Sequence, residues 1–371
     1  MNVLSIVGAR PQFVKAAAVS RQLREDHDET LVHTGQHYDA ELSDVFFEEL
    51  AIPEPDHHLG VGSDSHAAQT AEMMVELERV VLDASPDVVL VYGDTNSTLA
   101  GALVASKESI PLAHVEAGLR SGDFSMPEEV NRVLTDHCSD LLFAPTTAAR
   151  KNLECEGIVE GVTVPGDVMY DTLLQVRDRL DDGGDGIDDA GDRLDEGGRI
   201  DVHETIDVPD EFVLATVHRA KNTDDPDRLA GIVDGLGDCP YPVVLPAHPR
   251  TVAALREFDL WERATESVEI VDPVGYLSFV SLVERARCVA TDSGGVQKEA
   301  FYLDTPCVTL RDTTEWTETV DAGWNRLVGA DAEQIADAIR SAGDLPPKPD
   351  LYGNGTAASR IVRTLEREVG Q

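Results

Sequence analysis

The most restrictive feature of this sequence is an alternation of short apolar segments with helical segments, which occurs twice along the chain. In the first half the apolar segments lie at residues 3–7, 31–34, 88–92, 112–115 and 141–144. In the second half they lie at residues 212–216, 243–245, 268–271, 288–291 and 307–310. Strands that alternate with helices are typical of parallel sheets with helices on both faces. The sequence therefore predicts an α/β fold with two Rossmann-like, doubly wound domains.

The length of 371 residues also favours two hydrophobic cores over one. We expect an N-terminal domain over residues 1–168 and a C-terminal domain over residues 169–354. A helical tail at residues 355–369 is expected to pack back on the first domain. Residues 181–204 are rich in Gly and Asp and poor in apolar side chains. This composition predicts an acidic surface insertion without a catalytic role.

The position of polar residues along the chain predicts where a ligand would bind. The run VVLVY at residues 88–92 is apolar throughout, which indicates a central strand of a parallel sheet. Polar clusters follow this and other apolar segments. In doubly wound sheets, ligands bind outside the carboxyl ends of the strands. We therefore expect an active site in the cleft between the two domains.

The charge of the chain excludes several partners. Seventy acidic against thirty basic residues give a net charge of −40. Such a surface repels nucleic acid and anionic membranes. Acidic excess also fits a halophilic protein, because molar salt screens self-repulsion over about 3 Å. No apolar run approaches the roughly 20 residues of a membrane span, and the N-terminus lacks a signal-peptide pattern, so a cytoplasmic location is expected.

The cysteine and histidine patterns argue against a metal site or disulfides. The five cysteines are odd in number and form no CxxC pair, so we expect small buried side chains in a reducing compartment. No HExxH motif is present. The histidines therefore show no spacing that would indicate a metal ligand set.

The segment TDSGGVQKEA at residues 291–300 is a candidate phosphate site, because it follows an apolar strand and opens a helix. Ser293, Gly294 and Gly295 would let backbone N–H groups and a hydroxyl approach an anion at the helix N-terminus. Glu299, one turn later, could accept hydrogen bonds from ribose hydroxyls. The alternative is a tight turn in which glycine serves packing alone.

Three carboxylates could act as general acids or bases. Asp94, Glu116 and Glu128 each follow an apolar segment closely or begin a helix. Burial and neighbouring charges tune such groups for proton transfer. The alternatives are a helix N-cap for Asp94 and an ordinary first-turn acid for Glu128.

Basic residues and histidines lie near the same turns. Arg10 and Lys15 flank the first strand-to-helix turn and could meet an anion, or could simply face solvent. His218 follows a strand of the second half and could bind a phosphate or transfer a proton. A lone histidine is also compatible with a structural role.

Several motifs, taken together, carry a resemblance to a known family. They are GARPQFVK (residues 8–15), TGQH (34–37), GDTNST (93–98), HVEAGLRSGD (114–123), MPEEVNR (126–132), VHRAKNTD (217–224), DSGGVQKEA (292–300) and RDTTEW (311–316). In this order they resemble the non-hydrolysing UDP-N-acetylglucosamine 2-epimerases. The similarity runs from residue 3 to about residue 362, and only the acidic insertion stands outside it.

The resemblance implies a glycosyltransferase-B-like pair of Rossmann domains and an isomerase. Family members interconvert UDP-N-acetylglucosamine and UDP-N-acetylmannosamine, with 2-acetamidoglucal and UDP as intermediates and without metal or nicotinamide. By motif, Asp94, Glu116, Glu128 and His218 would be catalytic. The groups implied to bind UDP are Arg10, Lys15, His218, Ser293, Gly294, Gly295 and Glu299. A homodimer is also what the family suggests.

Departures from the family pattern leave other functions open. Lys221 and Lys298 stand where many bacterial members have acids, and Trp316 stands in place of an arginine. The QKEA and TEW variants look more like the branch that acts on UDP-2,3-diacetamido-2,3-dideoxyglucuronate, so Lys298 and Trp316 could set sugar specificity, or Lys298 could face solvent. An arginine that helps bind an activating second substrate aligns with Ala68. Further alternatives are a UDP-sugar glycosyltransferase, a hydrolysing epimerase and a UDP-sugar-binding regulator.

Overall fold

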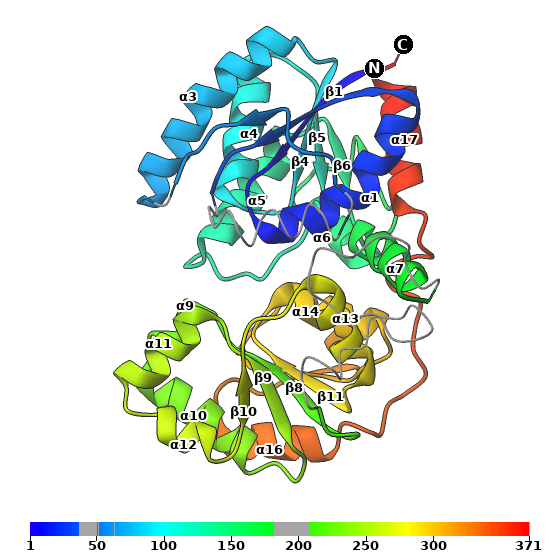
Figure 1. Cartoon of the computed structure of the whole chain (residues 1–371). Coiled ribbons are helices and arrows are strands. Elements are labelled where there is room, and N and C mark those ends of the chain that lie inside the picture. Colours follow the sequence, from blue (N-terminus) through cyan, green and yellow to red (C-terminus); the bar gives the residue numbers. More distant parts are fainter. Residues whose placement is uncertain (37–49, 51, 63, 182–207, 371) are drawn as a thin grey trace. The chain divides into compact units, whose positions relative to one another are not determined.

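The chain folds into two compact units, each built around a parallel sheet (Figure 1). The computed structural model describes residues 1–36, 50, 52–62, 64–181 and 208–370. Unit 1 comprises Met1–Val176 and Asp350–Gln371, and unit 2 comprises Arg177–Pro349. Residues 182–204 of the predicted insertion, and the last residue of the TGQH motif, lie outside the described residues.

Unit 1 contains a seven-stranded sheet in the order β3-β2-β1-β4-β5-β6-β7, with every neighbouring pair parallel. Its strands are β1 (Asn2–Val7), β2 (Asp28–His33), β3 (His57–His58), β4 (Val88–Tyr92), β5 (Leu112–Val115), β6 (Leu141–Phe143) and β7 (Val162–Thr163). All five side chains of β4 are buried. The prediction that this apolar run is a central, parallel strand is confirmed. The chain winds outward from β1 in one direction and from β4 in the other, so the topological switch point lies between these two strands.

Helices cover both faces of this sheet, as right-handed crossovers on either side of a switch point require. They are α1 (Arg10–Asp26), α3 (His66–Ala84), α4 (Asn96–Lys107), α5 (Pro127–Cys138), α6 (Thr147–Cys155), α7 (Val168–Asp181) and α17 (Ala357–Glu368). Helices α1 and α17 pack together, and α4 contacts both α3 and α5 (Figure 1). Under α3 and α4 lies a cluster of buried aliphatic side chains that includes Leu4, Met73 and Val91.

The C-terminal segment returns to unit 1. His27 at the end of α1 lies 3.1 Å from Glu366 of α17, and the Ala358 amide donates to Asp171 of α7 at 2.8 Å. The hydroxyl of Thr172 donates to the Val14 carbonyl of α1 at 2.8 Å. These bonds attach the first half of α7 to unit 1, so the unit extends beyond residue 168, where the sequence placed the domain boundary.

Unit 2 repeats the plan with a six-stranded parallel sheet in the order β10-β9-β8-β11-β12-β13. Its strands are β8 (Val213–Thr216), β9 (Val243–Pro246), β10 (Glu269–Val271), β11 (Cys288–Thr291), β12 (Cys307–Thr309) and β13 (Asn325–Leu327). Its helices are α9 (Ala220–Thr223), α10 (Pro226–Gly237), α11 (Pro249–Glu257), α12 (Trp261–Thr265), α13 (Tyr276–Arg285), α14 (Gly294–Tyr302), α15 (Thr317–Asp321) and α16 (Ala332–Arg340). Here the switch point lies between β8 and β11.

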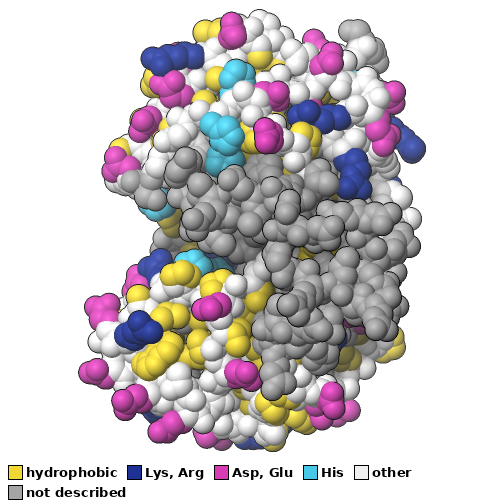
Figure 2. Space-filling model, in the orientation of Figure 1, with side chains coloured by type: hydrophobic (Ala, Val, Ile, Leu, Met, Phe, Trp, Pro, Cys, Tyr) yellow, Lys and Arg dark blue, Asp and Glu magenta, His cyan; other side chains and the backbone are white. Residues whose placement is uncertain are grey.

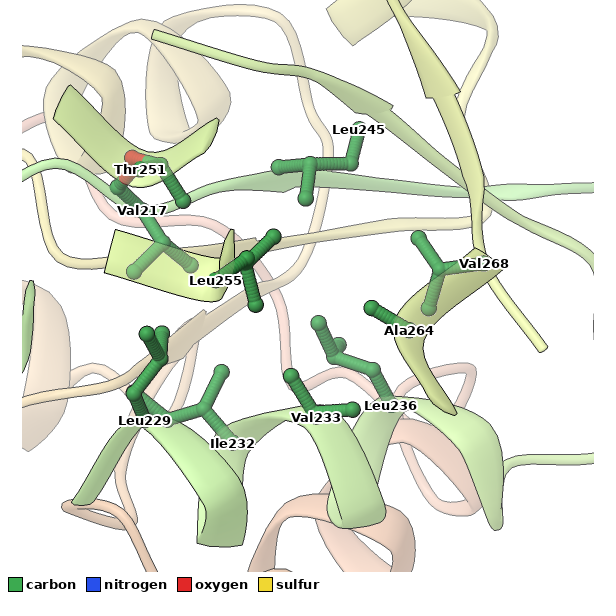
Figure 3. Close-up of a pocket in the computed structure, with 10 residues that line it drawn as sticks. All are labelled: Val217, Leu229, Ile232, Val233, Leu236, Leu245, Thr251, Leu255, Ala264 and Val268. Atoms are coloured by element: carbon green, nitrogen blue, oxygen red, sulfur yellow. The ribbon is translucent and has the colours of Figure 1, made fainter. Parts of the chain in front are cut away.

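A small cavity lies in the core of unit 2, among apolar side chains from α10, α11, α12 and β9 (Figure 3). The polar group on its wall belongs to Thr251, whose hydroxyl donates to the Val217 carbonyl. Because this hydroxyl is already bonded and the other lining residues, such as Leu236 and Leu255, are aliphatic, the cavity is a gap in core packing.

The cysteines are less uniformly buried than the sequence predicted. Cys288 and Cys307 are buried, and burial raises the pKa of each thiol to about 12. Cys155 is exposed, and Cys138 and Cys239 are partly exposed. The prediction of small buried side chains is therefore right for Cys288 and Cys307, which lie in strands, and wrong for Cys155.

Candidate active site

The switch point of unit 1 is held together by Gln12, a buried residue of α1. Its side-chain oxygen accepts from the amides of Gly8 and Ala9, at 2.8 and 3.1 Å. Its side-chain nitrogen donates to the Tyr92 carbonyl at 2.8 Å. One side chain thus links the turn after β1 to the end of β4, where the candidate acids begin.

Lys15 and Glu116 form a buried ion pair beside this turn. The Lys15 Nζ lies 2.7 Å from Glu116 Oε1, and the side chains are 7% and 6% exposed. Glu116 follows β5 with φ of 73°, a left-handed conformation that few non-glycine residues adopt. A Cβ on Gly93 would lie 3.0 Å from the Lys15 Nζ, so glycine leaves room for the pair. The sequence suggested an anion as the partner of Lys15; in the structure its ammonium meets a carboxylate of unit 1.

Asp94 lies at the end of β4 and is paired with Arg132 of α5. The Asn131 side chain donates to the Asp94 carbonyl at 3.0 Å. The N-cap of the following helix is Thr95, so the alternative that Asp94 caps α4 is wrong. The carboxylate of Asp94 is instead aimed at a cation on a neighbouring helix and remains 24% exposed.

The two adjacent glutamates that begin α5 have different surroundings. Glu129 is fully buried and accepts from the Ser121 and Gly122 amides and from Arg132. Glu128 is half-buried, and among the described residues no hydrogen bond or ion pair engages its carboxylate. It does lie in the first turn of α5, as its structural alternative proposed. Glu129 therefore holds the backbone at Ser121 and Gly122 in place, whereas the carboxylate of Glu128 is available to a ligand.

Sequence reasoning missed two residues of this site, Glu129 and Arg132. Both belong to the MPEEVNR motif, whose helical spacing of three places them on one face of α5. That spacing could have indicated that Glu129 and Arg132 interact. It could not indicate that Arg132 also pairs with Asp94 at the end of β4. Of Arg10 the structure describes only the backbone, as the first residue of α1.

In unit 2, Asp292 organises the switch point between β8 and β11. It is fully buried, and its carboxylate accepts from the amides of His218 and Arg219 at 3.1 and 3.0 Å and from Asn222 Nδ2 at 3.0 Å. The His218 Nδ1 lies 3.4 Å from the same carboxylate, and the imidazole is 42% exposed. Asp292 was part of a quoted motif but was not singled out from the sequence. It fixes where the His218 ring lies.

The N-terminus of α14 is shaped by Ser293 and Gly294. Ser293 is the N-cap and accepts from the Val296 amide. A Cβ on Gly294 would lie 2.4 Å from Glu315 Oε1, so only glycine fits there without displacing that carboxylate. Glu299, one turn into α14, is buried. The packing alternative for this glycine turn is thus supported, and it is compatible with open backbone N–H groups at the helix end.

Comparison with known proteins identifies the family. The family model described as UDP-N-acetylglucosamine 2-epimerase matches residues 21–366. The chain belongs to this family. A UDP-N-acetylglucosamine 2-epimerase of Methanocaldococcus jannaschii is 42% identical over 98% of this chain and 99% of its own. A UDP-2,3-diacetamido-2,3-dideoxy-D-glucuronate 2-epimerase of Pseudomonas aeruginosa is 46% identical over 99% of this chain and all of its own.

Solved structures of the UDP-N-acetylglucosamine 2-epimerase family share the fold. The M. jannaschii enzyme in complex with UDP-GlcNAc and UDP has a TM-score of 0.89 at 42% identity, covering 99% of this chain and 100% of that one. The Neisseria meningitidis enzyme bound to UDP-GlcNAc has a TM-score of 0.86 at 30% identity, with the same coverage. The predicted family, and the predicted pair of Rossmann-like units of the glycosyltransferase-B-like fold, are confirmed.

Two lysines that depart from the family pattern, Lys298 and Lys221, lie in different surroundings in this epimerase. Lys298 of α14 is 1% exposed, and its Nζ lies 4.1 Å from the ring centroid of Trp316. The alternative that Lys298 faces solvent is wrong. Lys221 lies 3.0 Å from Asp312 on the surface. Burial acts to raise the pKa of Asp312, but Lys221 and Arg228 outweigh it and lower the pKa.

The described part of the epimerase offers no group of three or more His, Cys, Asp or Glu side chains that could hold a metal ion. Within the same residues, no helix combines the length and apolar character that a membrane crossing needs.

Proposed function

We propose that this protein catalyses the reversible epimerisation of UDP-N-acetylglucosamine at C2, giving UDP-N-acetylmannosamine. The observation that carries the proposal is the set of three carboxylates in unit 1, Asp94, Glu116 and Glu128, which lie at strand ends or at a helix start. Two of them face cations, and the third is open to a ligand. Transfer to an acceptor or simple binding needs no removal and return of a proton at C2, so neither function accounts for three such groups.

The chemistry explains why several groups are needed. A base removes the C2 proton while the bond between C1 and the UDP oxygen breaks, which leaves 2-acetamidoglucal and UDP. UDP then adds back to C1, and a proton is delivered to the opposite face of C2. Because the proton leaves and returns on different faces, one carboxylate cannot serve both steps. Asp94, Glu116 and Glu128, with His218, are proposed to share these roles.

Unit 2 is proposed to bind the UDP. Ser293, Gly294 and Gly295 would present a hydroxyl and backbone N–H groups to the diphosphate, and the N-terminal end of α14 adds partial positive charge. Glu299 would accept from the ribose. In unit 1, Arg10 and Lys15 are proposed to face the phosphates as the bond to C1 breaks. Stabilising the departing UDP electrostatically is the contribution of this set to catalysis.

A second candidate substrate is UDP-2,3-diacetamido-2,3-dideoxyglucuronate, on which the 46% identical relative acts by its name. The buried Lys298 beside Trp316 favours it, because an ammonium in low dielectric would bind a sugar carboxylate strongly. UDP-N-acetylglucosamine carries no such carboxylate.

An NMR time course in D2O and molar KCl tests the proposal, with each nucleotide sugar in a separate tube. We expect UDP-N-acetylglucosamine to become the manno epimer with deuterium at C2 and UDP still attached. Turnover of UDP-2,3-diacetamido-2,3-dideoxyglucuronate alone would show that this nucleotide sugar, and not UDP-N-acetylglucosamine, is the substrate. Release of free sugar would indicate a hydrolysing enzyme, and no reaction in either tube with intact UDP binding would indicate a transferase.

We further propose a cytoplasmic homodimer. Exposed apolar side chains, Val75 and Leu82 on α3 and Val130 and Leu134 on α5, lie on helices that flank α4. On the face drawn in Figure 2, acidic side chains are spread over both units. Apolar side chains in such an acidic surface are compatible with self-association. Light scattering at molar KCl should give twice the chain mass, and Leu82→Asp should give the chain mass itself.

A further inference from the structure

His114, in β5, is buried between two acceptors. Its Nε2 lies 2.7 Å from the carbonyl oxygen of Gly93, and its Nδ1 lies 2.8 Å from Asp136 Oδ1. His114 and the Asp136 side chain are fully buried. A carbonyl oxygen can only accept, so Nε2 must carry a proton.

The second nitrogen decides the charge of the ring. A carboxylate also only accepts, so the short contact to Asp136 requires a proton on Nδ1 as well, unless the carboxyl itself is protonated. The surroundings of Asp136 oppose that exception. Its other oxygen, Oδ2, accepts from the Gly118 amide at 3.1 Å and from Arg120 Nη1 at 2.7 Å. Both bonds come from donors and stabilise the ionised form of this carboxyl group.

The remaining charges around the ring form an alternating chain. Arg120 pairs with both oxygens of Glu156, at 2.7 and 2.8 Å, and His137 lies 3.3 Å from that glutamate. If His114 is a cation, positive and negative groups alternate from His114 through Asp136 and Arg120 to Glu156. A neutral ring would leave Asp136 with one fewer donor in a buried site, which is costly.

His114 connects the elements that carry the three candidate acids. Gly93, whose carbonyl it binds, is the residue before Asp94, and the Gly93 amide donates to the Val115 carbonyl at 3.0 Å, next to Glu116. Asp136 belongs to α5, the helix that carries Glu128. Resting on the proposed function, we infer that His114 is a positioning residue that works as a doubly protonated imidazolium and fixes the ends of β4 and β5 for proton transfer at C2.

Two isosteric variants separate this role from simple packing. A glutamine at residue 114 can keep a donor near the Nε2 position, towards Gly93, whereas an asparagine keeps one near Nδ1, towards Asp136. We expect His114→Asn to lower kcat about 100-fold with KM within about threefold. The reason is that a small displacement of the reacting groups lowers the rate of the chemical step strongly. His114→Gln should stay within about tenfold of wild type. The exposed His57, changed to Asn or Gln, is the matched control and should leave kcat unaltered.

The outcomes against the proposal are specific. A larger loss in His114→Gln than in His114→Asn would show that the bond to Asp136 matters and the bond to Gly93 does not. Equal losses would show that the bond to Gly93 has no special part in positioning the acids, and would also contradict the proposal. UDP binding by calorimetry shows whether unit 2 is intact in each variant. An inactive wild type with intact binding would count against the proposed function and not against the charge state of His114.

The charge state has a readout that needs no activity. In the wild-type protein with 15N-labelled histidine, the signals absent from the His114→Gln spectrum belong to this ring. At pH 8 we expect both ring nitrogens to carry a proton, because each of them faces an acceptor. A ring with one bare nitrogen at that pH would overturn the inference, whatever the kinetics show.

Discussion

The Lys15 ammonium and the Glu116 carboxylate lie 2.7 Å apart at the end of β5, and both side chains are almost completely buried. Two buried charges compensate one another only as a pair, and removing one leaves the other without compensation. The pair is therefore a structural element of unit 1 as well as part of the proposed chemistry, and variants of either residue must be judged on folding and on turnover.

Glu116→Gln should abolish epimerisation, by at least about 1,000-fold in kcat, while UDP binding stays within about threefold of wild type. The amide cannot take a proton from C2, although it can still accept from Lys15. Calorimetry with UDP and the D2O assay measure the two effects. Glu160→Gln, an exposed residue of the same unit, is the control. Turnover like that of wild type would remove Glu116 from the mechanism.

Gly294→Ala should weaken UDP binding at least about tenfold. The new methyl group would lie 2.4 Å from Glu315 Oε1, whose carboxylate is held 2.9 Å from Arg311, so the start of α14 must shift. Gly62→Ala is the matched control, since its new methyl group would meet no atom of the described residues within 4 Å beyond its chain neighbours. Calorimetry on both variants measures the effect, and unchanged affinity in Gly294→Ala would place the diphosphate elsewhere.

Lys298→Met should lower turnover of the diacetamidoglucuronate about 10- to 100-fold and turnover of UDP-N-acetylglucosamine less than about threefold. Methionine keeps the volume and packs well on the Trp316 ring, but it cannot bind a carboxylate. Lys348→Met is the control, because that lysine also lies against an aromatic ring, 4.9 Å from the Phe301 centroid. Equal losses on the two substrates would make Lys298 a packing residue.

Acid should destabilise unit 1 through Asp136. Its pKa is lowered in the folded protein, so its contribution to stability is complete above the unfolded value of about 3.9 and is lost as pH falls through the folded value. Asp136→Asn should therefore melt at a lower temperature than wild type at pH 7, with the difference shrinking below about pH 4. Thermal scans at constant KCl measure it, with the exposed Asp83→Asn as reference. A difference that is independent of pH would contradict the assignment.

The sequence predicted the interior of each sheet well, because buried parallel strands leave continuous apolar runs such as VVLVY. It missed β3, β7 and β13, which have two or three residues each and lie at sheet edges, where no such run is required. The candidate acids were found because they follow strands. Their partners were not, since Arg132 meets Asp94 across 38 positions of sequence and His114 meets Asp136 across 22. Tertiary pairing of this kind leaves no local pattern.

The return of α17 to α1 means that unit 2 is an insertion within the chain of unit 1. On the ribosome, unit 2 is complete in sequence while unit 1 still lacks the helix that covers α1. Unit 1 can bury that face of α1 only after α17 has been synthesised, so a product truncated before α17 would contain a complete unit 2 and an incomplete unit 1. Circular permutation that joins the neighbouring termini, seen together in Figure 1, would reverse this order of synthesis.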